Sequence, residues 1–315
     1  MRVLGRLALC AVIAVLAAEV RPAAIVPSAA LLRVVATTED LASLAREIGG
    51  DKVVVVGLAK GYQDPHNVDP KPSFILEVSR ADVLIAVGRE LEIGWLPPLI
   101  TQSRNARIQP GAAGFLDASS NVKILEIPTG ALTRAMGDVH PSGNPHYWLD
   151  PNNGRLIAQL IQQKFGELDA ADRAYFAQRY TDFDRRLAAA EKRWDAMMAP
   201  YKGTRLVTYH RSWPNFMERF GLEVMGYVEP KPGIPPSPTH TIELIAEMKR
   251  QGVKLVVMES YFDSKTPEKI AAQVGGKVVT LSPSVGGEAA AKDYLLLFEY
   301  NVGTLAAALK AATGK

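Results

Sequence analysis

Short segments rich in β-branched residues alternate with amphipathic segments along most of the chain. Strands are predicted at residues 33–36, 52–56, 81–87, 205–209, 223–227, 254–258 and 277–281, and residues 122–127 are expected to close the first half. Helices are predicted at residues 38–48, 71–79, 213–220, 242–251, 267–274 and 293–311. This alternation indicates βαβ units, and therefore an α/β fold of two lobes, each with a mostly parallel sheet flanked by helices.

One long helical pattern lies between the two halves, at residues 170–198. Its apolar positions recur with a period close to 3.6, at Phe176, Tyr180, Phe183, Leu187, Trp194 and Met198. About 28 residues of helix reach roughly 40 Å, enough to traverse a two-lobed molecule. We therefore predict an N-terminal α/β lobe at residues 31–165, one long rigid lobe-joining helix at 166–200 and a C-terminal α/β lobe at 201–315.

The first 24 residues have the pattern of a secretory signal peptide. Arg2 and Arg6 form a basic start, and the apolar stretch 7–18 is shorter than the roughly 20 residues of a membrane span. Cleavage is expected between residues 18 and 30. Cys10 is the only cysteine, and it lies inside the apolar stretch rather than after it, which disfavours lipid attachment. No later segment approaches a span, so we expect a soluble periplasmic protein.

Charge and composition narrow the partners of the mature chain. The formal net charge of +3 includes the arginines of the signal, and no basic run of the kind that binds nucleic acid is present. We expect that the protein binds no nucleic acid and that it is a monomer. Removal of the signal would leave no cysteine, so a metal site would have to consist of histidines and carboxylates.

Three of the five histidines stand in short motifs at predicted strand ends or loop mouths. His66 lies in Asp64-Pro65-His66, His146 in Asn144-Pro145-His146, and His210 directly follows the strand 205–209. Neutral imidazole is the ordinary zinc ligand, and three such ligands nearly complete a tetrahedral site. Ligands of open α/β sheets bind beyond the carboxyl ends of the strands, so these side chains are expected to face one cleft.

Other polar residues around these motifs have less specific roles. Glu259 follows the strand 254–258 and is a metal ligand, a partner that orients an imidazole, or a simple strand-end carboxylate. His140 is assigned to a loop, although it could reach the site, and His240 to an exposed helix start. Asp150 is expected to cap a helix or hold the loop of His146. Two tryptophans are expected to pack around the site: Trp148 and Trp213.

Signatures of hydrolytic enzymes are missing from the sequence. It contains no His-Glu-x-x-His helix, no Gly-x-Ser-x-Gly elbow and no phosphate-binding glycine loop. Only Glu259 or Asp263 could serve as the base of a catalytic zinc. We therefore predict a binding protein and not an enzyme, with an exported zinc hydrolase, adhesin or zinc chaperone as the alternatives.

The same motifs resemble those of the bacterial metal receptors that feed ABC transporters for zinc and manganese, the zinc-uptake or TroA-like family. The matching pieces are Asp64-Pro65-His66, Asn144 to Pro151, Tyr209-His210 and Glu259-Ser260, and the likeness extends over nearly the whole mature chain. It implies two α/β lobes joined by one long helix, a metal ion in the cleft, and delivery of that ion to a membrane permease.

One departure from the family concerns the fourth ligand. Members commonly supply an Asp from the loop that corresponds to residues 281–285, where this chain has Pro283. The fourth position is therefore open to Glu259, Asp263, His140 or water. The histidine-rich loop of many zinc members is also missing. Manganese members often have Glu in place of His210, so three imidazoles favour Zn²⁺ over Mn²⁺ as the transported ligand.

Overall fold

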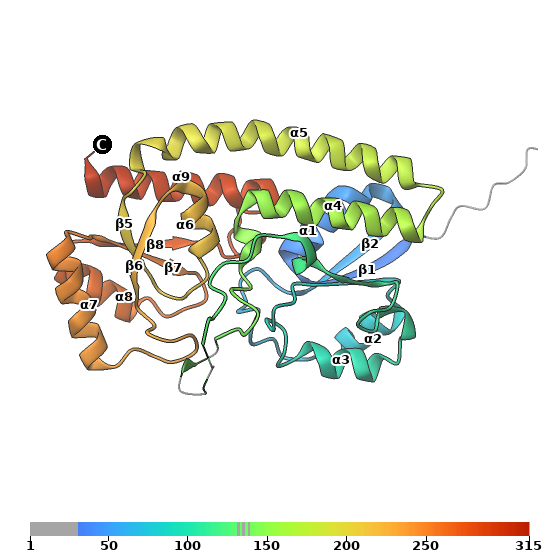
Figure 1. Ribbon diagram of the computed structural model, residues 1–315, viewed down its shortest axis with the longest axis horizontal. Coiled ribbons are helices and arrows are strands. Elements are labelled where there is room, and N and C mark those ends of the chain that lie inside the picture. The colour runs from blue at the N-terminus through green and yellow to red at the C-terminus, as the bar shows by residue number, and fades with distance from the viewer. Residues whose placement is uncertain (1–30, 131–132, 134–135, 138, 315) are drawn as a thin grey trace, which may run out of the picture. The chain divides into compact units, whose positions relative to one another are not determined.

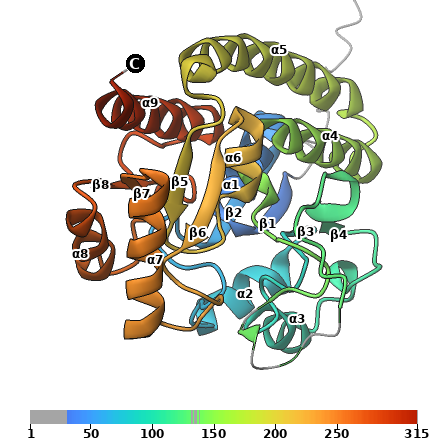
Figure 2. The ribbon, with the colours of Figure 1, turned by 60° about the vertical axis from the view of Figure 1, so that its left-hand side comes forward.

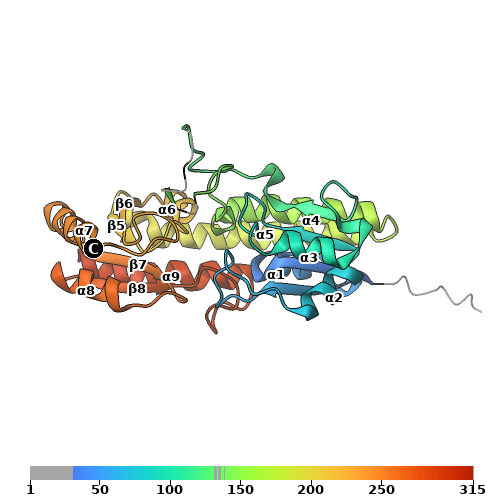
Figure 3. The same ribbon diagram turned by 90° about the horizontal axis from the view of Figure 1, so that it is seen from below.

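The computed structural model describes residues 31–314 except 131–132, 134–135 and 138. From Leu31 onward the chain forms one compact unit that contains two parallel four-stranded sheets. The sheets lie side by side along the molecule (Figures 1 and 3). The predicted α/β class, with a sheet in each half, is confirmed.

The first sheet has the strand order β2-β1-β3-β4. Its strands are β1 (Leu32–Thr38), β2 (Val53–Ala59), β3 (Val83–Ala86) and β4 (Phe115–Asp117). The surrounding helices are α1 (Glu39–Gly49), α2 (Pro72–Arg80) and α3 (Leu96–Ser103). Successive side chains of a strand point to opposite faces, so Val34 packs with α1 while Val35 packs with α2 and α3. Burial on both faces explains the continuous apolar run of β3, whereas β2 is an edge strand and leaves Val54 47% exposed.

The second sheet repeats this arrangement with the order β6-β5-β7-β8. Its strands are β5 (Arg205–Thr208), β6 (Glu223–Tyr227), β7 (Leu255–Glu259) and β8 (Lys277–Leu281). The helices nearby are α6 (Pro214–Phe220), α7 (Pro238–Gln251) and α8 (Lys265–Gln273). Helices α7 and α8 cover one face of this sheet, away from α6 (Figure 2). Parallel pairing brings the carboxyl ends of all four strands to one edge.

Three longer helices pack together beside the two sheets. These are α4 (Pro151–Leu168), α5 (Arg173–Met198) and α9 (Tyr294–Thr313). Helix α5 runs along both α4 and α9 and leads from the first half into β5 (Figure 1). Helix α5 is shorter than the predicted helix at 166–200. The first residues of that range belong to α4, which continues to Leu168 and is capped by Asp169. The lobe bounds at 165 and 201 stay predictions.

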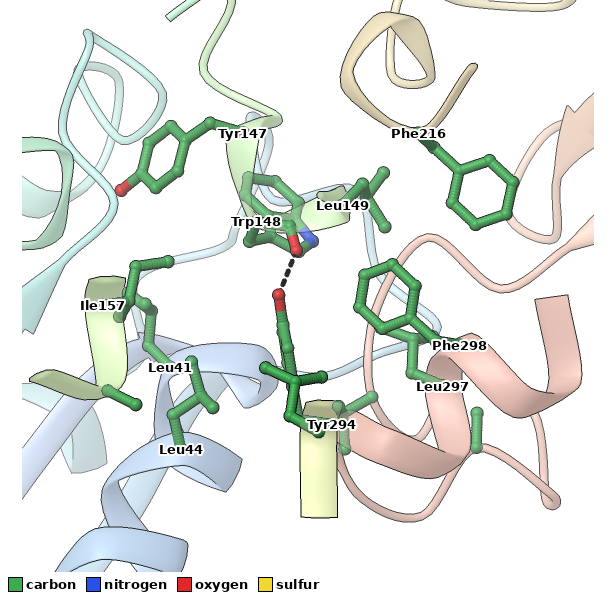
Figure 4. Close-up of a cluster of buried hydrophobic side chains, with 14 of the residues drawn as sticks. Leu41, Leu44, Tyr147, Trp148, Leu149, Ile157, Phe216, Tyr294, Leu297 and Phe298 are labelled. Carbon is green, nitrogen blue, oxygen red and sulfur yellow. Dashed lines mark hydrogen bonds between the residues drawn. The ribbon is translucent and has the colours of Figure 1, made fainter. Parts of the chain in front are cut away.

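A shared core lies between the two sheets. Figure 4 shows Trp148, Tyr294 and Phe298 meeting Leu41 of α1 and Phe216 of α6. The Tyr294 hydroxyl donates to the carbonyl oxygen of Trp148 at 2.5 Å. Buried aromatic side chains therefore join the halves, in addition to the long helix.

Two expectations from the sequence were wrong. Residues 122–127 form no strand, because Lys123 N–H donates to Asn153 and the Leu125 carbonyl accepts from Asn144 N–H instead of pairing with the sheet. The sequence was also expected to hold no segment after the signal that approaches a membrane span. Helix α9 is long and apolar enough to cross a membrane, judged by length and composition only. Its inner side packs in the core through residues such as Phe298.

Candidate metal-binding site

Three histidines meet where the carboxyl ends of the strands face the connecting segment. His66 lies in the loop after β2, His146 precedes the short turn Tyr147–Leu149, and His210 follows β5 by two residues. Each offers one ring nitrogen, and these nitrogens all lie within 4.8 Å of one another. The ring centroids are 5.0 Å apart for His66 and His146, and 5.5 Å from each of these to His210. Distances of this order allow one small ion to contact all three.

His66 and His146 are held by the same local motif. In each case a side-chain oxygen two residues earlier accepts hydrogen bonds from the backbone N–H and from the ring Nδ1 of the histidine. Asp64 Oδ1 lies 3.0 Å from His66 N and 2.8 Å from its Nδ1. Asn144 Oδ1 lies 2.9 Å from His146 N and 3.0 Å from its Nδ1. The proline between the two members restricts the backbone of each motif.

His210 is oriented by a residue that sequence reasoning missed. Its Nδ1 lies 2.5 Å from Oε2 of Glu229, and both side chains are buried. Glu229 follows β6 by two residues, at the same sheet edge and next to β5. A carboxylate just beyond a strand end was the available signal, but only the pairing of β6 with β5 brings it to His210.

The Nδ1 bonds leave Nε2 as the metal-facing nitrogen of each ring. His66 Nε2 and His146 Nε2 are buried and have no hydrogen-bond partner. A buried polar atom without a partner costs free energy, and a bound cation would remove that cost. Imidazoles held at Nδ1 by oxygen acceptors, with Nε2 directed inward, form the usual arrangement of zinc-binding histidines. The donor set therefore suits a zinc ion.

Electrostatics affect two members of this cluster in opposite directions. Burial, together with the nearby His66 and His210, holds the pKa of His146 well below its usual range. Burial also opposes ionisation of His210, but its hydrogen bond to Glu229 and the charge of Glu259 raise its pKa overall. A metal ion competes with protons for these nitrogens, so suppressed protonation of His146 favours metal binding.

Glu259 lies at the end of β7 next to this cluster. Its side chain is fully buried, and neither carboxylate oxygen has a hydrogen bond of normal geometry. Burial raises its pKa, while His210 and the side chains of Ser212 and Trp213 oppose that rise. Among the described residues, the group of donor atoms that are mutually within 4.8 Å contains the three histidines and not Glu259. Glu259 is thus a neighbour of His210 and not a member of that group.

The other candidates for the fourth position differ in where they lie. The His140 ring is 5.3 Å from the His66 ring, so it borders the cluster although it was assigned to a loop. Asp263 has a 67% exposed side chain and accepts from Lys265 N–H at 2.8 Å. The carbonyl of Pro283 accepts from Trp148 Nε1 at 3.1 Å, so this loop packs on the core. Among the candidates for the fourth position, the geometry leaves Glu259 and His140 nearest the cluster.

The remaining expectations concern supporting residues. Asp150 caps α4 by accepting from Asn152 N–H. Trp148 packs 5.3 Å from the His146 ring, and Trp213 is buried. His240 lies at the start of α7 but is only partly exposed, since its Nε2 lies 2.9 Å from the Tyr227 carbonyl. A cavity of about 300 Å³ adjoins the cluster, and its lining includes His140, His146 and His210.

Comparisons with known proteins identify the family of this chain. The family model described as zinc-uptake complex component A, periplasmic, matches residues 34–308. The metal ABC transporter substrate-binding lipoprotein SloC of Streptococcus mutans is 24% identical over 284 residues, which cover 87% of this chain and 89% of that protein. The high-affinity zinc uptake system protein ZnuA of Bacillus subtilis is 22% identical over 265 residues, which cover 81% of this chain and 79% of that protein.

Among solved structures, the binding protein FpvC from Pseudomonas aeruginosa in complex with Mn²⁺ matches with a TM-score of 0.75 and 26% identity. The match covers 90% of this chain and 99% of that chain. Because the family model spans most of the sequence, this protein belongs to the zinc-uptake component A family of substrate-binding proteins of metal ABC transporters.

Proposed function

We propose that this protein is a periplasmic receptor that binds one Zn²⁺ ion with high affinity and delivers it to the membrane permease of an ABC importer. The observation that carries the proposal is the convergence of His66, His146 and His210, with each Nδ1 bonded to an oxygen. Three neutral nitrogen donors suit zinc better than a harder ion. The ion is cargo, and no catalytic step is assigned.

The proposal includes location and assembly. The protein acts as a monomer, exported by a signal peptide over residues 1–24 that is cleaved. The family description as periplasmic and the basic and apolar pattern of the N-terminal segment support the exported location. Several relatives are named lipoproteins, such as SloC of Streptococcus mutans. Mass spectrometry of the exported protein distinguishes a cleaved soluble chain from a lipid-modified one.

A second candidate function is manganese transport by the same site. The buried Glu259 carboxylate supplies an oxygen donor beside His210, and oxygen donors favour manganese. The related FpvC was solved with Mn²⁺. This alternative needs Glu259 to join the three histidines as a ligand.

Competition titration separates the two candidates. Metal-stripped protein is titrated with zinc and then with manganese against a chromophoric chelator. We expect one zinc ion per chain, bound far more tightly than manganese. Comparable or tighter manganese binding would favour the second candidate function, manganese transport. If neither ion binds tightly, the assignment to metal transport fails.

A further inference from the structure

Glu126 links the segments that carry two of the three histidines. It lies in the connecting segment before His146 with a left-handed backbone, at a φ of 52°. Its Oε2 accepts from Asn144 Nδ2 at 2.9 Å, and its Oε1 accepts from Arg211 Nη1 at 3.1 Å. Oε1 also lies 3.3 Å from the Tyr227 hydroxyl, and the Arg211 guanidinium stacks 4.1 Å from the Tyr227 ring. A non-glycine residue in this backbone region is uncommon and needs support from its surroundings.

These contacts fix which way the Asn144 amide faces. Asn144 Nδ2 donates to Glu126 Oε2 and, at 2.8 Å, to the carbonyl oxygen of Arg211. A carboxylate and a carbonyl oxygen only accept hydrogen bonds, so the NH₂ end of the amide must point toward them. Asn144 Oδ1 faces His146, where it accepts from the backbone N–H at 2.9 Å, a contact that favours the same orientation, and lies 3.0 Å from Nδ1.

The orientation of this amide decides the tautomer of His146. Because Oδ1 only accepts, His146 must carry its proton on Nδ1, which places the lone pair on Nε2 in the cluster. A flipped amide would present NH₂ to Nδ1 and favour the tautomer with the proton on Nε2. His66 has no such dependence, since both oxygens of Asp64 accept. The tautomer of His146 therefore depends on Asn144 and, through Asn144, on Glu126.

We propose that Glu126 is a positioning residue that selects the metal-binding tautomer of His146 through Asn144 and also holds Arg211, the residue next to His210. This rests on the proposed function for the role of His146 as a ligand. The tautomer itself is a property of the metal-free protein and can be tested without any ion.

The test uses NMR of the metal-free protein with ¹⁵N-labelled histidine. The native protein should show one neutral His146 tautomer with Nδ1 protonated. Glu126→Ala should show a mixture and should bind zinc about 10-fold more weakly, in line with other groups that orient metal-binding imidazoles. Glu223→Ala is the matched control, since Glu223 forms an exposed ion pair with Arg205 at the start of β6.

A residue swap makes the result specific. In Asn144→Asp both side-chain oxygens at position 144 accept, so His146 should carry its proton on Nδ1 whatever stands at position 126. Adding Glu126→Ala to this variant should therefore leave the tautomer unchanged, whereas Glu126→Ala alone should give a mixture. An unchanged tautomer and affinity in Glu126→Ala, or a mixture of tautomers in the double variant, would overturn the proposal. If native protein fails to bind zinc, the transport assignment fails while the tautomer result still decides the role of Glu126.

Discussion

Glu229 Oε2 accepts the Nδ1–H of His210 at 2.5 Å, in a pair whose side chains are both less than a tenth exposed. The carboxylate fixes the ring and increases the basicity of its other nitrogen. We expect Glu229→Gln to weaken zinc binding by about 10–100-fold, the range found when such partners are changed. Chelator competition measures this loss, with Glu223→Gln as the control at an exposed carboxylate. Equal affinities in both variants would contradict the assigned role of Glu229.

Removal of a histidine ligand should cost more. Structural zinc sites with four ligands bind with about 10–16 kcal/mol, so one ligand contributes roughly 3 kcal/mol, or about a 100-fold change in affinity. His66→Ala, His146→Ala and His210→Ala should each show at least this loss by titration. His240→Ala is the control, because His240 bonds to the Tyr227 carbonyl outside the cluster. Tight zinc binding retained in all three variants would refute the assignment of these histidines as ligands.

The fourth position can be assigned by comparing three substitutions. Glu259→Gln should weaken zinc binding and also raise the free energy of unfolding of the metal-free protein, because it removes a buried carboxylate without hydrogen bonds. His140→Ala should reduce affinity only if its ring moves from the border of the cluster into contact with the ion. Asp263→Ala should change neither quantity, since Asp263 faces solvent. Titration and urea unfolding of each variant provide the comparison, and a large effect of Asp263→Ala would contradict the geometry.

The stability of the protein should depend on pH through Asp40 of α1. Burial raises the pKa of Asp40 to about 7, against hydrogen bonds from Ser284 and the Val285 N–H that lower it. The unfolded chain releases this proton near 3.8, so the contribution of Asp40 to the free energy of unfolding falls as pH rises from about 4 to about 7. Below and above that window the contribution is constant.

Asp40→Asn tests this dependence, because Asn cannot titrate and still offers an oxygen to the Val285 N–H. Urea unfolding between pH 4 and pH 8 should show a smaller loss of stability in Asp40→Asn than in native protein. Glu92, whose pKa burial also raises to about 7, remains in both proteins and so cancels in the difference. Identical slopes in the two proteins would refute the prediction.

Gly154 of α4 should not accept a side chain. A Cβ at this position would lie 2.2 Å from the Tyr294 hydroxyl, which is itself bonded to the Trp148 carbonyl. Tyr294 is fully packed and cannot move aside at low cost. We expect Gly154→Ala to destabilise the protein by about 1–3 kcal/mol in urea unfolding, the range typical of overpacking. Gly303→Ala in α9, where a Cβ would meet nothing within 4 Å, is the control.

Much of the fold and part of the site could be predicted from local sequence. Valine runs and amphipathic spacing identify the strands other than β4 and the helices other than α3 and α4, because burial against a sheet leaves a hydrophobic signature. Asp64-Pro65-His66 and Asn144-Pro145-His146 are also local, since acceptor and histidine are two residues apart. These two motifs therefore predict their own geometry.

Other parts depend on contacts between distant segments. Glu229 meets His210 only because β6 pairs with β5, and no pattern within either segment shows this. The segment 122–127 has strand-like residues, yet its backbone bonds to Asn144 and Asn153, which lie later in the chain. His140 was placed in a loop that could reach the site, and only the folded chain brings its ring to 5.3 Å from that of His66. The pattern within a segment does not show which distant segments it will contact in the folded protein.

The shared aromatic core has a consequence for how an importer could tell a loaded receptor from an empty one. Opening the halves would pull Tyr294 from Trp148 and expose rings that are now dry, with a cost of several kcal/mol. Large rotation between the halves is therefore disfavoured, whether or not an ion is present. Under the proposed function, the difference between a loaded and an empty receptor would therefore lie in the loops that carry His66, His140 and His210, and not in the packing of the two halves.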